Sequence, residues 1–208
     1  VVISVTVVGT AARPIGRCGA RAGDWICVSG TLGDAALGFR LMEGGGAPPI
    51  TRDAEALKRA FLDPIPRLEL GRELARLGLA SAMIDISDGL SVDLAHLCEE
   101  SGTGAEVDLG RIPLSGAAVR MAGKRALPAA LNGGEDFELL FTVRPSARNR
   151  ALLDRLVRRH DVTPIGRIVA GAGSRIEIDV GNQRMSVWQG GERLWTFVVS
   201  TGMAGYPT

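Results

Sequence analysis

Two aspartates form the pattern in this sequence that is best suited to chemistry. Asp85 and Asp88 lie in the segment 84–90, where an apolar strand ends and a helix opens, so that both carboxylates can be aimed at one ion. Mg²⁺ is a hard cation that binds a few carboxylates together with waters and substrate phosphates. Ser87, between them, can cap the helix or bond a phosphate at its N-terminus. Spacing alone also allows a simpler interpretation, in which Asp85 is a surface residue and Asp88 only an N-cap.

Two glycine-rich turns could bring further polar groups to a ligand. Residues 29–34 place glycines and hydroxyls before a predicted helix, where free N–H groups favour anions, but no lysine follows as in a Walker loop. A tight strand-to-helix turn capped by Ser29 or Thr31 is the simpler interpretation. Residues 133–136 end in two adjacent carboxylates, which are usually solvated at a turn. Each turn is therefore informative only together with the aspartate pair.

Arg17 is a candidate for phosphate binding. It lies in the glycine-containing loop 16–20, from which an extended guanidinium can reach phosphate oxygens, although most loop arginines are only solvated. His96 and His160 lie on predicted helices without a partner at nucleophile or metal spacing, so both are interpreted as structural. The sequence contains no Ser/His/Asp arrangement.

The composition predicts a packed protein without a strong charge bias. The 208 residues are 46% hydrophobic, and 24 Lys and Arg nearly balance 23 Asp and Glu, so neither nucleic acid nor a membrane is an expected partner. The three cysteines show no CxxC pair and no zinc spacing, which indicates reduced thiols and a cytoplasmic location. The apolar start, residues 1–11, is too short to span a bilayer and lacks a clear signal-peptide plan.

The elements that position these residues alternate between strands and helices. Apolar and β-branched runs predict strands at residues 1–8, 25–28, 81–86, 105–109, 137–143, 164–169, 175–180 and 184–188. Helical spacing and caps predict helices at residues 35–42, 51–61, 68–77, 90–98, 114–121, 127–131 and 146–160. This order indicates an α/β (α+β) fold, with a mixed β-sheet and helices packed on one face.

Three segments taken together resemble the C-terminal half of thiamine-monophosphate kinases. They are RCGARAGDWICVSGTLGDAALGF (residues 17–39), AMIDISDGLSVDLAHLCEESGTGAEVDL (residues 82–109) and LNGGEDFELLFTV (residues 131–143). These enzymes belong to the superfamily of aminoimidazole ribonucleotide synthetase. The resemblance implies a C-terminal α/β domain that holds ATP and magnesium against a separate, dimerising N-terminal domain. The activity it implies is transfer of the ATP γ-phosphoryl group to thiamine phosphate, giving thiamine diphosphate.

The resemblance also assigns roles to individual residues. Asp85 and Asp88 match the magnesium-binding aspartates. Arg17 and Ser87 match contacts to ATP, and Glu135 matches a contact to the thiamine substrate. Phosphoryl transfer depends on positioning and charge neutralisation, so no protein nucleophile is required and no catalytic residue is assigned.

The resemblance divides the chain into three parts. Residues 1–10 correspond to a remnant strand of a missing N-terminal domain, residues 11–190 to the ATP-handling domain, and residues 191–208 to an atypical tail, in which Trp195 either stacks on the substrate or merely packs. The chain is therefore expected to be inactive alone, although the intact family is homodimeric. Two alternatives stay open: another ATP-dependent enzyme of the superfamily, selenophosphate-synthetase-like or hydrogenase-maturation-like, and a non-catalytic nucleotide-binding module.

Overall fold

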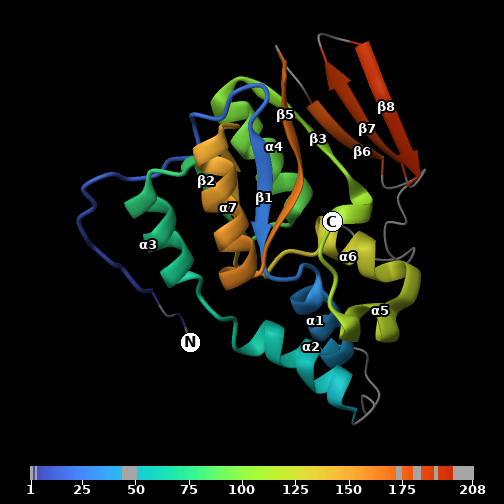
Figure 1. Ribbon diagram of the computed structural model, residues 1–208. Coiled ribbons are helices and arrows are strands. Elements are labelled where there is room, and N and C mark those ends of the chain that lie inside the picture. The colour runs from blue at the N-terminus through green and yellow to red at the C-terminus, as the bar shows by residue number, and fades with distance from the viewer. Residues whose placement is uncertain are drawn as a thin grey trace.

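The computed structural model describes residues 2, 4–43 and 51–171, together with the backbone of 175–179, 184–189 and 192–198. Its centre is a five-stranded sheet in the order β2-β4-β1-β5-β3 (Figure 1). The strands are β1 (Trp25–Ser29), β2 (Ala80–Ile86), β3 (Thr103–Val107), β4 (Glu138–Val143) and β5 (Val162–Ala170). Each pair of neighbouring strands in this sheet is antiparallel.

The described helices agree closely with the predicted ranges. They are α1 (Asp34–Glu43), α2 (Arg52–Leu62), α3 (Leu68–Leu77), α4 (Leu90–Ser101), α5 (Gly116–Ala122), α6 (Ala126–Asn132) and α7 (Ala147–His160), with 3₁₀ turns η1 (Leu109–Arg111) and η2 (Gly123–Arg125). Local caps explain several boundaries: the Thr51 hydroxyl accepts from the Ala54 N–H at 3.1 Å, and Gly78 ends α3 in the left-handed conformation. Residue type thus fixes where these helices begin and end.

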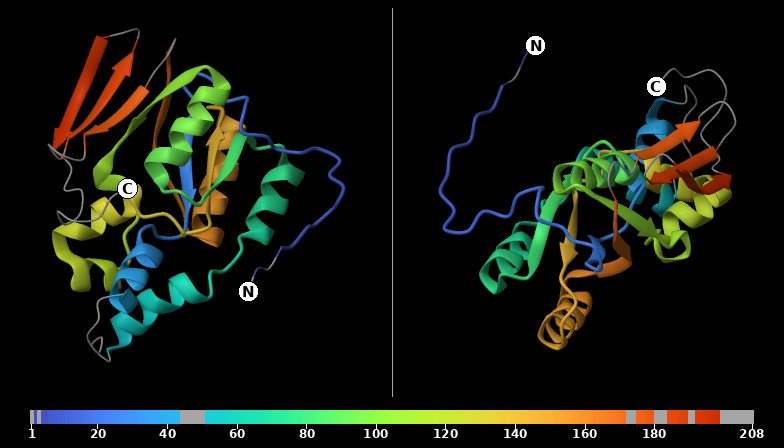
Figure 2. Two further views of the ribbon diagram at one scale, coloured as in Figure 1. Left: turned by 180° about the vertical axis from the view of Figure 1, so that it is seen from behind. Right: turned by 90° about the horizontal axis from the view of Figure 1, so that it is seen from above.

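Helices cover both faces of the sheet. Along β1, Ile26 and Val28 pack into the core beneath α4 and α6, whereas Cys27 packs into the core beneath α3 and α7. The right-hand view of Figure 2 shows α4 and α7 on opposite sides of the strands. The burial follows from the continuous apolar runs of β1 and β4, which have no polar face to turn towards water.

The predicted α+β class is confirmed, with two details corrected. The helices lie on two faces rather than one. The sheet is antiparallel rather than mixed, because β4 and β5, which α7 connects, both pair with β1 and not with each other. The strand β1 therefore separates what would otherwise be a parallel β-α-β pair.

A second, three-stranded antiparallel sheet follows in the chain. Its order is β6 (Arg175–Asp179), β7 (Arg184–Gln189) and β8 (Glu192–Val198). The first two strands were predicted, whereas β8 lies within residues 191–208 and was not. Trp195 is in β8, where its backbone pairs with that of Val187, and its side chain lies outside the described residues.

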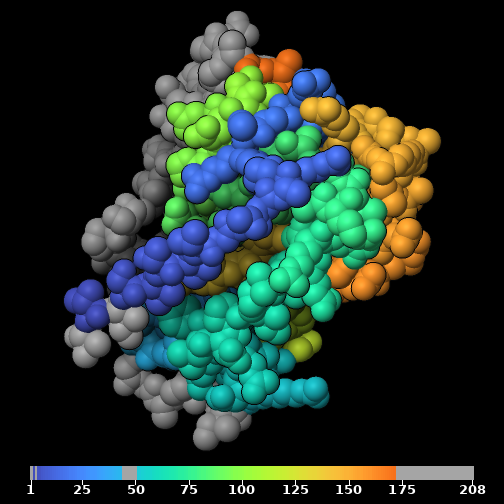
Figure 3. Space-filling view, turned by 90° about the vertical axis from the view of Figure 1, so that its left-hand side faces the viewer, coloured from blue at the N-terminus to red at the C-terminus, as the bar shows by residue number. Residues whose placement is uncertain are grey.

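The N-terminal segment does not form the predicted strand. Residues 2 and 4–10 have no ladder partner, and the exposed fractions of Val2, Val5, Val7 and Val8 are 80–97%. Figure 3 shows this segment in blue on the molecular surface. A strand requires a neighbour for its N–H and C=O groups, and the described chain supplies none here. That residues 1–10 belong to a separate domain stays a prediction.

The cysteines are mostly packed, as expected. Cys27 and Cys98 are buried, and burial raises the pKa of the Cys98 thiol to about 11, whereas Cys18 is exposed. Within the described residues, every helix is too short or too polar to cross a bilayer.

Candidate functional site

Three loops meet at one end of the central sheet. The strands β1 and β2 finish at this end of the sheet and β4 begins there, because β4 runs antiparallel to both. The pairings of Val28 with Leu140 and of Ile86 with Glu138 set these three strand ends side by side. The loops 30–33, 87–89 and 133–137 are therefore neighbours, although they are far apart in sequence.

The second and third loops are joined through their main chains. The N–H of Glu135 donates to the carbonyl oxygen of Ser87, and the N–H of Phe137 donates to that of Ile86, both at 2.8 Å. Gly134 has φ 67°, and a Cβ there would lie 2.5 Å from the Ser87 oxygen, so only glycine permits this approach. The structure thus brings together Ser87 and Glu135, two of the residues predicted from the sequence.

The third loop carries backbone strain. Glu135 and Phe137 have φ of 62° and 50°, in the left-handed region that non-glycine residues rarely occupy. Conformations of this kind cost about 1–3 kcal/mol each and gather at functional sites. Between them, Asp136 accepts the Gly33 N–H with both carboxylate oxygens, at 3.0 and 2.8 Å. The contacts to Ser87, Ile86 and Gly33 therefore hold the loop in its strained form.

Among the carboxyl groups at this end of the sheet, that of Asp136 has the most strongly shifted pKa. Its pKa is raised to about 7, chiefly by burial and to a smaller extent by the neighbouring charges of Asp34 and Glu138, while the N–H groups of Gly33 and Ala35 oppose the change. Asp136 thus occupies the Gly33 N–H immediately before α1. Residues 29–34 are the tight strand-to-helix turn of the simpler interpretation, capped by Asp136 rather than by a hydroxyl of the turn.

A buried ion pair fixes the beginning of β4. Glu138 is 6% exposed, and its carboxylate accepts from the Nε of Arg67 at 2.7 Å, from a second guanidinium nitrogen and from the Ser29 hydroxyl. Ser29 in turn accepts the Leu139 N–H at 2.9 Å. Sequence reasoning did not single out Arg67, since nothing near it in the chain indicates a carboxylate partner.

The aspartate loop has an unexpected support. One carboxylate oxygen of Asp93, Oδ2, accepts the N–H groups of Ser87, Asp88 and Gly89 at 3.0, 3.0 and 3.1 Å. Gly89 is the N-cap of α4 and offers no side chain, so neither Ser87 nor Asp88 caps this helix as the sequence had suggested. Asp93 occupies the main-chain donors of the loop.

The loop consequently presents oxygen atoms to a ligand. Asp85 and Asp88 are exposed and Ser87 is half-buried. Asp85 lies on the opposite face of β2 from Ile84 and Ile86, which are buried in the core. Carboxylates and a hydroxyl are the hard donors that suit Mg²⁺. The described residues contain no cluster of three His, Cys, Asp or Glu side chains able to hold a metal.

Arg17 lies beside strand β2, away from the three loops. Its carbonyl oxygen accepts from the Ser101 hydroxyl at 3.3 Å, and the preceding carbonyl of Gly16 accepts from the Met83 N–H at 2.9 Å. Ser101 ends α4, and the rise of a helix places it about 16 Å from the aspartate loop. The described contacts do not bring the Arg17 guanidinium to the three loops, so its role stays a prediction.

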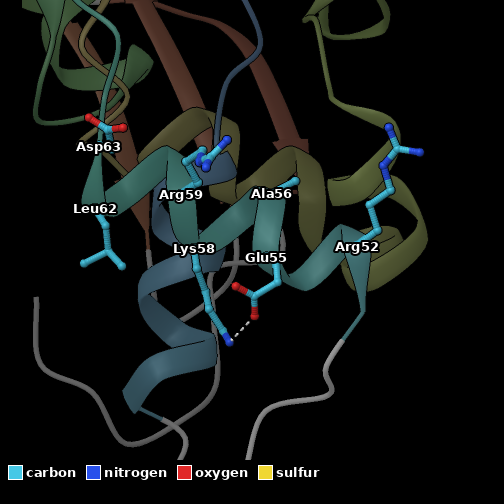
Figure 4. Close-up of a pocket in the computed structure, with 7 residues that line it drawn as sticks. All are labelled: Arg52, Glu55, Ala56, Lys58, Arg59, Leu62 and Asp63. Atoms are coloured by element: carbon cyan, nitrogen blue, oxygen red, sulfur yellow. Dashed lines mark hydrogen bonds and ion pairs between the residues drawn. The ribbon is translucent and has the colours of Figure 1, made fainter.

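A hollow on the described surface lies away from these loops. It follows the outer side of α2 and is lined by Arg52, Glu55, Ala56, Lys58, Arg59, Leu62 and Asp63 (Figure 4). Lys58 and Glu55 form an ion pair at 2.8 Å there. None of its residues belongs to the three loops, and a hollow along the outside of a single helix does not enclose a ligand.

The fold and the three neighbouring loops define an α+β domain with an acidic site built on loops. The chain belongs to the family described as AIR synthase related protein, C-terminal domain, whose model matches residues 21–179. That match contains all three loops.

Several of the proteins to which this chain is similar are thiamine-monophosphate kinases. Thiamine-monophosphate kinase of Escherichia coli (strain K12) is 39% identical over 181 residues, 86% of this chain and 54% of that protein. The crystal structure of thiamine-monophosphate kinase from Stenotrophomonas maltophilia K279a gives a TM-score of 0.70 at 40% identity, over 78% of this chain and 52% of that one. AaThiL complexed with AMPPCP and TMP gives 0.67 at 36%, over 77% and 50%. The chain spans about half the length of the relatives it matches.

The hydrogenase-maturation alternative shares the fold alone. Hydrogenase maturation protein HypE in complex with ATP gives a TM-score of 0.54 at 17% identity, over 78% of this chain and 49% of that one. The similarity to thiamine-monophosphate kinases is greater in both sequence and structure.

Proposed function

We propose that this chain is the C-terminal, nucleotide-handling part of a thiamine-monophosphate kinase, which transfers the γ-phosphoryl group of ATP to thiamine phosphate. Similarity of 36–40% to enzymes of that name supports the assignment, one of them in complex with the ATP analogue AMPPCP and with TMP. The observation that carries it is the contact between the loops 87–89 and 133–137, through the Glu135 N–H and the Ser87 oxygen. This contact sets the predicted ATP loop beside the predicted substrate loop.

The chemistry asked of these residues is positioning and charge neutralisation. Asp85 and Asp88 would hold Mg²⁺, with the Ser87 hydroxyl near the nucleotide, and the bound ion would neutralise charge on the phosphates. Glu135 would contact the thiamine substrate, and Arg17 would contact a phosphate group of ATP. The carboxylates of the two joined loops would thereby orient the acceptor phosphate against the donor phosphate.

The relatives are about twice as long as the part that this chain matches, which bears on whether the chain is active alone. Because the chain spans about half of them, we propose that it does not turn over alone and that a further domain and a second subunit complete the enzyme in the cytoplasm. Thiamine diphosphate formation can be measured for the 208-residue chain and for a hybrid in which residues 21–179 replace the matching part of the E. coli relative. An active hybrid beside an inactive chain supports the proposal. A hybrid that folds and binds ATP without turnover favours a non-catalytic module.

The aspartate pair provides the sharper test. In the active hybrid, Asp85→Asn and Asp88→Asn should each lower activity at limiting Mg²⁺ by about 100-fold or more, since each removes a charge facing the ion. Both side chains are exposed, so urea unfolding should change by less than about 0.5 kcal/mol. Glu99→Gln, at an exposed carboxylate of α4, is the matched control. Near-normal activity of both variants would show that these carboxylates are only surface groups.

A further inference from the structure

Asp93 is a carboxylate at a buried position where packing alone does not require a charged residue. It is 2% exposed, and among the described residues it has no cationic partner. Burial raises the pKa of its carboxyl group, and hydrogen bonds from the main chain of the aspartate loop oppose that change. An ionised carboxylate is costly to bury, so its hydrogen bonds have to compensate for lost water.

The sequence position of Asp93 makes the same point. Leu90, Leu94 and Leu97 are buried and lie on one face of α4 at spacings of four and three residues. Asp93, three residues after Leu90, falls on that face as well. An apolar residue would pack there at lower cost. The carboxylate instead turns back to the N-terminus of its own helix and accepts three consecutive N–H groups.

These bonds determine what the loop can bind. The N–H groups of Ser87, Asp88 and Gly89 all donate to Asp93, so they cannot also hold a phosphate as open helix N-termini do. The side-chain groups that the loop offers a ligand are the Ser87 hydroxyl and the carboxylates of Asp85 and Asp88. The arrangement selects a cation at this loop, with phosphate reaching the loop through that cation.

We propose that Asp93 is a positioning residue, which fixes the main chain of residues 87–89 and thereby the geometry of the Asp88 carboxylate and Ser87 hydroxyl towards a divalent cation. The inference rests on the proposed metal role of Asp85 and Asp88. Groups that orient metal ligands typically change metal affinity by 10–100-fold when they are removed. Asp93 itself does not touch the ion.

The experiment uses the 208-residue chain, ¹⁵N-labelled, with Mn²⁺ as the probe. In the wild type, Mn²⁺ should broaden the amide signals of residues 85–88 first. Asp93→Asn should require at least about 10-fold more Mn²⁺ for the same broadening, and hydrogen exchange at residues 87–89 should quicken about 10-fold. Ser91→Ala is the matched control, because the Ser91 hydroxyl is buried in the same turn without a hydrogen-bond partner in the described structure, and it should change neither readout.

A second variant separates position from charge. Asp93→Glu keeps the charge and displaces the carboxylate by one methylene, so it should behave like Asp93→Asn, whereas a purely electrostatic role would be rescued. It also serves if Asp93→Asn unfolds. Unchanged Mn²⁺ affinity in a folded variant overturns the role of Asp93. Absence of broadening at residues 85–88 in the wild type overturns the metal site of this chain and the role of Asp93 with it, whereas the proposed function is tested separately by the activity of the hybrid.

Discussion

The chain builds two strand-turn-helix units that look alike in sequence and are held in different ways. In the first, β1 leads through residues 30–33 into α1, and in the second, β2 leads through residues 87–89 into α4. A carboxylate occupies main-chain N–H groups at both helix starts. In the first unit it belongs to Asp136, more than a hundred positions away, and in the second to Asp93 of the helix itself.

The difference separates a local support from a long-range one. The turn 87–89 acquires its support as soon as α4 forms, because Asp93 is part of that helix. The turn 30–33 acquires its support only when β4 has paired with β1 and brought the loop 133–137 into place. A change in the third loop should therefore reach the first turn directly and leave the main chain of the second largely intact.

The largest effect is expected from removing the local support. Asp93→Ala leaves three N–H groups without their acceptor, and an unsatisfied buried donor costs about 1–3 kcal/mol. Partial access of water reduces the sum, so the free energy of unfolding should fall by about 3 kcal/mol in urea titrations. Asp136→Ala, which frees fewer donors and removes a buried charge, is the comparison. A larger loss for Asp136→Ala would reverse the ranking of the two supports.

A smaller effect is expected from separating the second and third loops. In Gly134→Ala, the new Cβ would meet the Ser87 oxygen at 2.5 Å in addition to adopting a positive φ. Gly78→Ala has a similar φ of 59°, in the left-handed region, and open space around the Cβ, so it isolates the backbone term, about 1 kcal/mol. Gly134→Ala should cost about 1 kcal/mol more than Gly78→Ala, or about 2 kcal/mol in all. Equal losses would mean that the contact yields without strain.

The smallest effect is a pH dependence of the long-range support. The pKa of Asp136 is about 7, above the ordinary value near 3.9 for aspartate. The folded state therefore binds this proton more tightly, and its contribution to the unfolding free energy is present below about pH 4 and is lost as pH rises to about 7. The full shift would correspond to about 4 kcal/mol, but Asp136 is only half-buried and solvent screening reduces this, so relative to Asp136→Asn the wild type should lose about 1–2 kcal/mol over this interval. Parallel urea stability curves for the two proteins would contradict the assignment.

Local features of the fold could be predicted from the sequence because their causes are local. Thr51, Ser146 and Gly78 bound their helices with groups only a few residues away. The placement of Ser87 and Glu135 at one site followed from resemblance rather than from spacing. The second covered face of the sheet could also have been found, because the runs Trp25–Ser29 and Glu138–Val143 have apolar residues on both sides.

Other features depend on contacts that no local pattern reveals. The bond between Gly33 and Asp136 and the ion pair between Arg67 and Glu138 join distant segments. Asp93 is an intermediate case. Its position among Leu90, Leu94 and Leu97 was a visible signal, since a carboxylate on a core face needs a partner, but the partner is main chain and has no residue type.

The position of β1 at the centre of the sheet has a consequence for the order of folding. This strand is the first of the sheet to leave the ribosome, yet Val28 pairs with Leu140 on one side and Thr163 on the other. Its partners emerge only after most of the domain has been synthesised, and contacts of such long sequence separation form slowly. Until then its unpaired N–H and C=O groups are open to wrong partners, including a second nascent copy. The central strand β1 can complete its pairing only after β5 has been synthesised, so β5 sets the earliest moment at which the central sheet can be complete.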